Sequence, residues 1–170
     1  MGPQGSGKST QAKMLAEKFG LCFISSGDLL REKAKEDSDE GRLIKLQMNQ
    51  GILVDDSILA QLIENKVNEC GGKFVMDGYP RRMSQIDAYD PNLKKVFILK
   101  VSDEEILKRL LARGRFDDTE ENIKKRLEWH HKETQPVIEY YKNQGILVEI
   151  NGLGTVEEIA RQIMAHLKKV

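Results

Sequence analysis

The sequence predicts an α/β fold with a doubly wound parallel sheet and helices on both of its faces. The runs "KFVMD" and "KKVFILKV" are continuously apolar and of strand length, as expected for strands that are covered on both faces. Stretches with helical spacing of apolar residues separate such runs. Strands that alternate with helices indicate βαβ units, and 170 residues fit one domain spanning residues 1–170.

In the N-terminal half, a helix should begin within "MGPQGSGKST" and end at Gly20, because glycine favours the left-handed conformation that closes a helix. "CFIS" is then expected as a short buried strand. "GRLIKLQMNQG" and "DDSILAQLIENKVNECGG" have helical spacing, and the second has an Asp cap before it and paired glycines after it. "GILV" should connect these two helices.

In the C-terminal half, two helices begin with capping-box pairs, Ser102 with Glu105 and Thr155 with Glu158. "ILVEI" between these helices should form another strand. The stretch from Thr119 to Tyr141 has helical spacing, and we expect a break near Pro136 because proline lacks the N–H that a helix needs.

The composition limits the classes of partner. The 27 basic and 27 acidic residues cancel, so neither nucleic acid nor an anionic membrane is expected as a partner. No apolar run reaches the roughly 18 residues of a membrane span. Cys22 and Cys70 lack metal-ligand spacing, so we expect two thiols, no disulfide and a cytoplasmic protein.

Residues 2–9, "GPQGSGKS", match the phosphate-binding pattern G-x-x-x-x-G-K-[ST] in full. Gly2, Gly5 and Gly7 allow the backbone to curl so that successive N–H groups point inward, and the following helix adds the positive end of its dipole. Lys8 can reach the β- and γ-phosphates of a nucleotide, and Ser9 can ligate Mg²⁺. The pattern therefore predicts a P-loop.

Further segments place arginines at the ends of predicted elements, where side chains can reach a central cleft. They are "SSGDLLR", "DGYPRR", "RLLARGRFDD" and "IKKRL". Arginine binds phosphate oxygens in pairs and keeps its charge. A cluster for several phosphates is therefore expected from Arg31, Arg81, Arg109, Arg113, Arg115 and Arg126.

From Gly2 to the C-terminal helix, the chain resembles the adenylate kinases within the nucleoside-monophosphate kinase family. "GPQGSGKST", "SSGDLLR", "DGYPR" and "GRFDD…IKKRL" occur in the family's order. The resemblance implies a cytoplasmic, monomeric enzyme that transfers the γ-phosphoryl group of Mg·ATP to AMP and forms two ADP. It also implies Mg²⁺ as cofactor, a mobile acceptor-binding segment over residues 26–59 and a short lid over residues 114–119.

The resemblance also assigns roles to individual residues. ATP would bind Gly2, Gly5, Ser6, Gly7, Lys8, Ser9, Thr10, Arg109 and Arg113. AMP would bind Ser26, Arg31, Gly78, Arg81, Gln85, Arg115 and Arg126, with Gln85 on the adenine base. Catalysis would rest on Lys8, Arg81, Arg113, Arg115 and Arg126. Ser9 and Asp77 would hold Mg²⁺, partly through water, and Asp117 and Asp118 would orient the lid.

The sequence departs from the family in two places. Only Gly114 separates Arg113 from Arg115, so the lid is very short and ATP hydrolysis without an acceptor becomes a possible side reaction. Only Met1 precedes the loop, where the family has an apolar strand; the expectation is therefore that the sequence starts late.

Three other functions stay open at this point. They are a kinase for UMP or CMP, a nucleotide-binding ATPase without an acceptor, and a nucleotide-binding remnant without catalysis. His130, His131 and His166 have no partner spacing and are interpreted as surface or packing residues.

Overall fold

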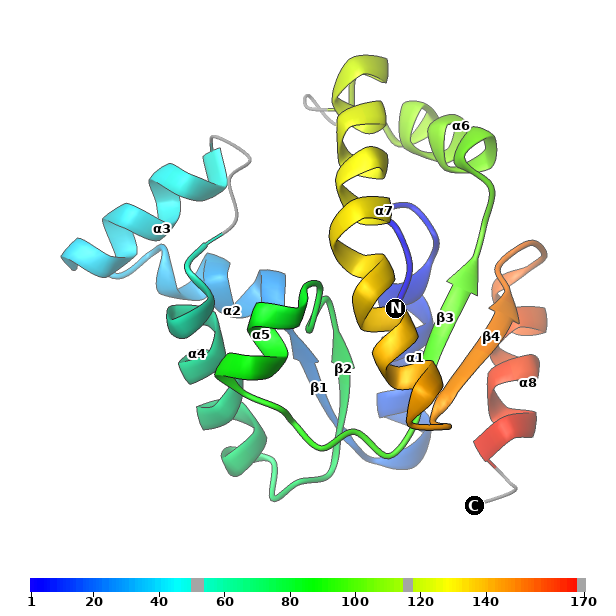
Figure 1. Ribbon diagram of the computed structural model, residues 1–170, viewed down its shortest axis with the longest axis horizontal. Coiled ribbons are helices and arrows are strands. Elements are labelled where there is room, and N and C mark those ends of the chain that lie inside the picture. The colour runs from blue at the N-terminus through cyan, green and yellow to red at the C-terminus, as the bar shows by residue number, and fades with distance from the viewer. Residues whose placement is uncertain (50–53, 115–117, 168–170) are drawn as a thin grey trace.

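The computed structural model describes residues 1–49, 54–114 and 118–167. Helices and strands alternate along the chain, and helices surround the strands (Figure 1). The α/β class predicted from the sequence is confirmed. The elements in chain order are α1 (Lys8–Phe19), β1 (Cys22–Ser25), α2 (Ser26–Lys33), α3 (Asp39–Asn49), α4 (Asp56–Glu69), β2 (Phe74–Asp77), α5 (Met83–Ala88), β3 (Val96–Lys100), α6 (Asp103–Arg113), α7 (Glu120–Asn143), β4 (Leu147–Asn151) and α8 (Val156–Leu167).

The strands form two parallel pairs. β1 pairs with β2, with Ser25 opposite Asp77, and β3 pairs with β4. No strand pairing within the described ranges joins one pair to the other. The first residue lies along β3, because the Leu99 N–H donates to the Met1 carbonyl at 3.1 Å and the Met1 amino group donates to the Phe97 carbonyl. Burial, with Lys8 nearby, lowers the pKa of that amino group to about 5.

Each strand pair has its own apolar cluster, and helices supply most of it. Helix α4 covers β1 and β2 through Leu59, Ile63 and Val67, which pack with Ile24 and Tyr79. Helices α1 and α8 pack against β3 and β4; the buried members are Leu15, Leu99, Ile150, Ile159 and Ile163. The carboxyl ends of the strands are thereby fixed relative to α1.

The two predicted capping boxes differ. At α8, the Thr155 N–H donates to the Glu158 carboxylate at 2.8 Å and the Glu158 N–H donates back to the Thr155 hydroxyl at 3.2 Å. At α6, Ser102 accepts from the Glu105 N–H at 3.3 Å, but the Glu105 carboxylate accepts from Arg109. The predicted capping bond from Ser102 is therefore confirmed. The reciprocal bond from the Glu105 carboxylate is not formed, because Arg109, one turn further along the helix, binds that carboxylate.

The predicted break at Pro136 is wrong, since α7 continues through it. Proline costs the helix one hydrogen bond to the carbonyl four residues earlier. That carbonyl belongs to Lys132, which is exposed and can bond to water. Val137, Ile138 and Tyr141 are buried directly after the proline, and their packing holds the helix together.

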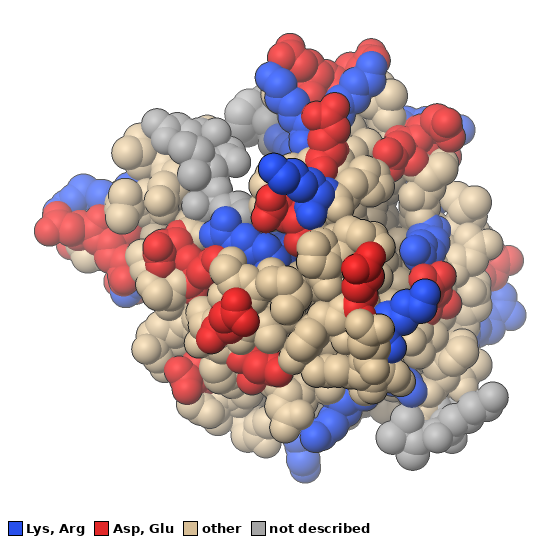
Figure 2. Space-filling view, in the orientation of Figure 1, with Lys and Arg blue, Asp and Glu red and all other residues tan. Residues whose placement is uncertain are grey.

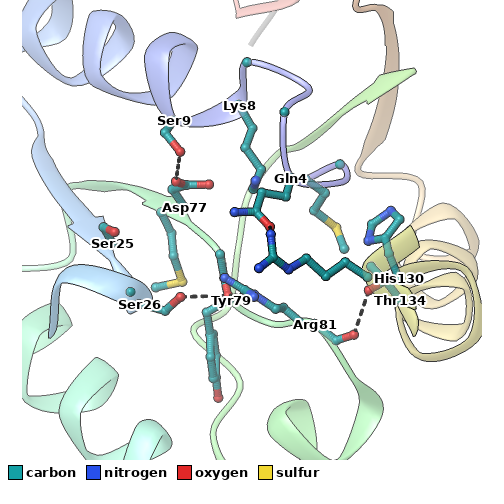
Figure 3. A pocket seen from close by; sticks show the side chains of 18 of the residues that line it. Gln4, Lys8, Ser9, Ser25, Ser26, Asp77, Tyr79, Arg81, His130 and Thr134 are labelled. Carbon is teal, nitrogen blue, oxygen red and sulfur yellow. Dashed lines mark hydrogen bonds between the residues drawn. The ribbon is translucent and has the colours of Figure 1, made fainter. Parts of the chain in front are cut away.

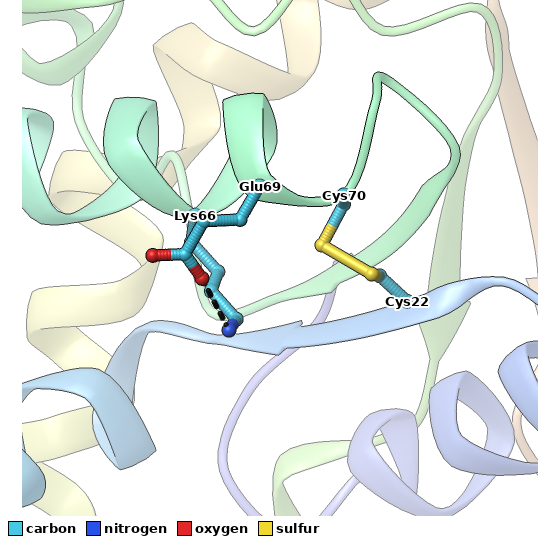
Figure 4. The surroundings of a disulfide bond; sticks show 4 residues. All are labelled: Cys22, Lys66, Glu69 and Cys70. Atoms are coloured by element: carbon cyan, nitrogen blue, oxygen red, sulfur yellow. Dashed lines mark hydrogen bonds and ion pairs between the residues drawn. A yellow bond between two sulfur atoms is a disulfide. The ribbon is translucent and has the colours of Figure 1, made fainter.

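The expectation of two thiols is also wrong. Cys22 and Cys70 form a disulfide between the start of β1 and the end of α4 (Figure 4). The two Cα atoms lie 5.8 Å apart although 48 positions separate them in the sequence. The parallel pairing of β1 with β2 creates this contact, and local cysteine spacing carries no trace of it. Across residues 1–49, 54–114 and 118–167, no helix combines the length and apolarity that crossing a membrane requires.

Candidate active site

A cleft of about 1250 Å³ opens where the P-loop meets the carboxyl ends of the strands. The P-loop and α1 form one part of its wall, the β1–α2 junction and the segment after β2 form another, and α6 and α7 complete it. In Figure 3, Ser25 and Ser26 lie on one side, His130 and Thr134 on the other, and Lys8, Gln4 and Arg81 between them. In Figure 2, basic side chains lie in the hollow between the α2–α3 side and α7.

The P-loop owes its shape to glycines with left-handed backbone. Gly5 has φ of 87° and Gly7, which precedes α1, has φ of 89°. A Cβ on Gly5 would also come within 3.0 Å of the Leu110 side chain of α6. A side chain there is therefore excluded both by the backbone conformation and by packing. Ser6 is fully buried, and its hydroxyl has no hydrogen-bond partner in the described part of the chain.

Lys8 begins α1 and lines the cleft. Its Nζ donates to the Pro3 carbonyl at 3.4 Å, so the side chain folds back over the loop. Burial lowers the pKa of Lys8, Asp77 opposes that shift, and Arg81 and Arg113 add to it. A phosphate group would relieve this concentration of positive charge.

The Ser9 hydroxyl donates to the Asp77 carboxylate at 2.5 Å. Asp77 ends β2 and is 8% exposed, whereas Ser9 lies in the first turn of α1. The structure therefore brings together Ser9 and Asp77, the two residues to which the family resemblance assigns Mg²⁺. No cluster of three or more His, Cys, Asp or Glu side chains suited to a metal occurs within residues 1–49, 54–114 and 118–167.

Arg81 is held by backbone carbonyl groups. Its Nε donates to the Gly78 carbonyl at 2.8 Å, and the same carbonyl accepts from Ser26 at 2.9 Å. The Arg81 carbonyl accepts from Thr134 of α7 at 3.0 Å. Burial lowers the pKa of the Arg81 guanidinium, opposed by Asp77. Through the Gly78 and Arg81 carbonyl groups, these bonds join the segment after β2 to the start of α2 and to α7, and one of them holds the Arg81 guanidinium.

Two predicted acceptor residues have other contacts. Gln85 is 1% exposed, does not line the cleft, and accepts the Arg81 N–H at 2.7 Å. Arg31 lines the cleft but forms an ion pair with Asp28 on its own helix, and this hydrogen bond is the main cause of the lowered pKa of Asp28. Arg31 must exchange Asp28 for a phosphate to act as predicted, and Gln85 must turn.

The arginines at α6 and α7 converge on one carboxylate. Arg113 donates twice to Asp118 at 2.8 Å, and Arg126 donates to the same side chain at 3.3 Å. The Asp118 side chain is 0% exposed. Arg109 also lines the cleft and donates to Glu105 and to the Gly152 carbonyl. Arg115 and Asp117 lie outside the described residues.

Sequence reasoning missed the face of α7 that lines the cleft. Lys125, Trp129, His130 and Thr134 lie there with Arg126. Trp129, His130 and Thr134 follow Arg126 by three, four and eight positions, which is the periodicity of one helix face, so the signal was present once Arg126 was placed in the cleft. His131, by contrast, is exposed and pairs with Asp103, as expected for a surface histidine.

A P-loop followed by a helix, with arginines that converge on it from several elements, defines a nucleotide phosphotransferase. The family model that describes adenylate kinase matches residues 1–146. The chain is 38% identical over 174 residues to an adenylate kinase of Synechococcus sp. strain RCC307, with 98% of this chain and 96% of that protein covered. It is 42% identical over 180 residues to an adenylate kinase of Leptospira biflexa, covering 98% and 97%, and 33% identical over 207 residues to that of Caldicellulosiruptor saccharolyticus, covering 98% and 96%. The chain belongs to the adenylate kinase family.

Proposed function

We propose that this protein catalyses the reversible transfer of the γ-phosphoryl group from Mg·ATP to AMP, giving two ADP. The observation that carries the proposal is the convergence of Lys8, Arg81 and the pair Arg113 and Arg126 on one cleft. Four cations suit a reaction in which two nucleotides bring several phosphates together. Membership of the adenylate kinase family supports AMP as the acceptor.

Phosphoryl transfer of this kind needs positioning and charge stabilisation rather than a covalent intermediate. The P-loop N–H groups and Lys8 would hold the β- and γ-phosphates of ATP. Arg81 and Arg31 would hold the phosphate of AMP, with Ser26 and Gln85 beside its base. Arg113, Arg126, Arg109 and Arg115 would stabilise the negative charge on the transferred group. We expect that the reaction rate does not depend on a single general base.

Ser9 and Asp77 fit Mg²⁺, because a hydroxyl and a carboxylate oxygen are hard donors and lie 2.5 Å apart. They would hold the ion partly through water. Bound Mg²⁺ would neutralise phosphate charge and orient the ATP tail. The chain's own contribution is to place these oxygens beside Lys8, at the end of β2 and the start of α1.

We propose further that residues 26–59 close over AMP and that residues 114–119 act as a short lid over ATP. In that movement, Arg31 would leave Asp28, its ion-pair partner on the same helix, and bind a phosphate. The protein is proposed to work as a monomer in the cytoplasm, in line with the family resemblance.

The test is product formation by the purified chain with Mg·ATP and AMP, CMP or UMP, followed by ³¹P NMR. ADP that appears only with AMP supports the proposal. Phosphorylation of CMP or UMP instead would make the protein a kinase of the same family with another acceptor. Phosphate release from ATP without any acceptor transfer would contradict the kinase function and favour the ATPase.

A further inference from the structure

His130 lies in the cleft but has no part in the mechanism above. It follows Arg126 by four positions and precedes Thr134 by four, so all three share the face of α7 that lines the cleft. The His130 ring contacts the His131 ring at 5.8 Å between centroids. Among the described residues, the His130 ring nitrogens have no hydrogen-bond partner. Their donor and acceptor capacity is therefore available to a molecule in the cleft.

The titratable groups that act on His130 come from several elements and are all bases. They are His131 on α7 itself, Lys8 at the start of α1, Arg81 after β2, and the Met1 amino group beside β3, which is neutral at pH 7 because its pKa is about 5. Burial is the main reason, and these groups the further reason, that the pKa of His130 is lowered to about 4. The imidazole is consequently neutral at pH 7 when no nucleotide is bound.

A nucleotide reverses the sign of the charge around this ring. Lys8, Arg81 and His130 all line the cleft (Figure 3), so phosphates bound to Lys8 and Arg81 would bring negative oxygens toward His130. A nearby anion favours the protonated form of an imidazole, and both of its nitrogens then become donors. Once phosphates are bound, Lys8 and Arg81 would therefore lower the pKa of His130 less than they do in the free protein.

We propose that His130 binds a phosphate oxygen of the bound nucleotide and takes up one proton from solvent when it does so. This inference rests on the proposed function, since it requires phosphates between Lys8 and Arg81. The oxygen belongs either to AMP, which Arg81 would hold, or to the γ-phosphate of ATP, which Lys8 would hold. His130 is thus a further substrate-binding residue, and nucleotide binding is linked to pH through it.

The first test uses the wild-type protein. The Cε1–H resonance of each histidine is followed by NMR from pH 4 to pH 8, alone, with AMP, and with a non-hydrolysable ATP analogue and Mg²⁺. His130→Gln and His131→Gln assign the resonances. The His130 midpoint is expected to rise from about 4 to about 7 with one of the two nucleotides, while the His131 midpoint stays. The nucleotide that produces the shift identifies the phosphate. A His130 midpoint that stays below about 6 with both nucleotides would overturn the proposal, because the ring would then take up almost no proton near neutral pH.

The second test measures affinity and proton uptake by calorimetry, in buffers with different ionisation enthalpies. His130→Gln should bind the effective nucleotide about tenfold more weakly than wild type at pH 6, but within about twofold at pH 8, since a rise of the His130 midpoint from about 4 to about 7 leaves the ring protonated in the complex at pH 6 and largely neutral at pH 8. The phosphate's own titration is common to both proteins and cancels. His131→Gln, on the exposed side of the same helix, should behave as wild type.

A purely structural role for His130 predicts another result. His130→Gln would then lose the same factor in affinity at both pH values and release or take up the same number of protons as wild type, which would refute the inference. Failure of the proposed function is recognised separately: wild type would then form no ADP from Mg·ATP and AMP, and neither nucleotide would displace any histidine resonance.

Discussion

Arg113 and Arg126 share the buried carboxylate of Asp118, whereas Lys8 and Arg81, in the same cleft, have carbonyl oxygens as their nearest hydrogen-bond partners. Among the described residues, no acidic side chain forms an ion pair with Lys8 or Arg81. We refer to the first two as the carboxylate-held arginines and to the second two as the carbonyl-held cations.

This difference in hydrogen-bond partners indicates two roles, one in positioning and one in attracting phosphate. A buried carboxylate removes much of the cost of placing two guanidinium groups together, so the carboxylate-held arginines are positioned before any nucleotide binds. The carbonyl-held cations form no ion pair among the described residues, and burial lowers the pKa of each although Asp77 partly opposes that shift. Charge without an ion-pair partner in a partly dry cleft gives the strongest attraction for phosphate. Lys8 and Arg81 therefore supply most of the attraction for phosphate, and Asp118 fixes the positions of the carboxylate-held arginines.

The largest effect is expected from Lys8→Ala. Loss of a carbonyl-held cation should lower phosphoryl transfer by about 10³-fold, since it removes charge where the transition state needs it, while the fold remains. The measurement is ADP formation from Mg·ATP and AMP, with thermal unfolding as the check on folding. Lys18→Ala, in the last turn of the same helix, is the control and should keep normal turnover. Comparable turnover in the two variants would show that the charge of Lys8 is not needed for phosphoryl transfer.

Asp118→Asn should act on stability first. It leaves Arg113 and Arg126 without their shared carboxylate, and these side chains are 29% and 33% exposed, so we expect a loss of about 1–3 kcal/mol in the free energy of unfolding. Urea denaturation measures it. Asp103→Asn, which breaks an exposed pair with His131, should cost less than about 1 kcal/mol. Equal losses would show that the buried carboxylate of Asp118 contributes no more to the free energy of unfolding than an exposed one.

His130 makes stability depend on pH. Its pKa is about 4 in the folded protein and 6.5 ordinarily, so the unfolded chain binds more protons between these values. Stability from this residue is complete above pH 6.5 and is lost as the pH falls toward 4, by about 2 kcal/mol after allowance for partial solvation. Denaturant titrations of wild type and His130→Gln at several pH values measure the difference. A gap that does not change with pH would mean that neither burial nor the basic neighbours lower the pKa of His130.

Thr134→Val should have the smallest effect. The change keeps the shape of the side chain and removes the hydrogen bond to the Arg81 carbonyl, which costs about 1 kcal/mol of stability. Turnover should fall by a few-fold because Arg81 becomes less well placed. The control is Thr155→Val, which removes the N-cap bond of α8, outside the cleft, and should keep normal turnover. A Thr134 variant with unchanged turnover would show that backbone bonds alone position Arg81.

The α/β class, the P-loop and most element bounds could be predicted because local patterns encode them: apolar runs, helix caps and the glycine spacing. Contacts between distant segments could not be predicted in this way. The Cys22–Cys70 bond, the Asp118 carboxylate under two arginines, and Gln85 turned onto the Arg81 backbone all depend on pairings that only the fold creates. The predicted helix break at Pro136 was wrong for a related reason, since the packing of buried residues after the proline outweighs the lost backbone hydrogen bond.

The Cys22–Cys70 bond lies at the base of the segment proposed to close over AMP, and both of its ends lie outside residues 26–59. The residues between the two cysteines, which include β1, α2, α3 and α4, are therefore part of one covalent ring. One proteolytic cut in the turn between α2 and α3 would open that ring without releasing a fragment. The cut protein would migrate as one species on a non-reducing gel and as two on a reducing gel, so the intactness of the segment has to be judged with the disulfide reduced.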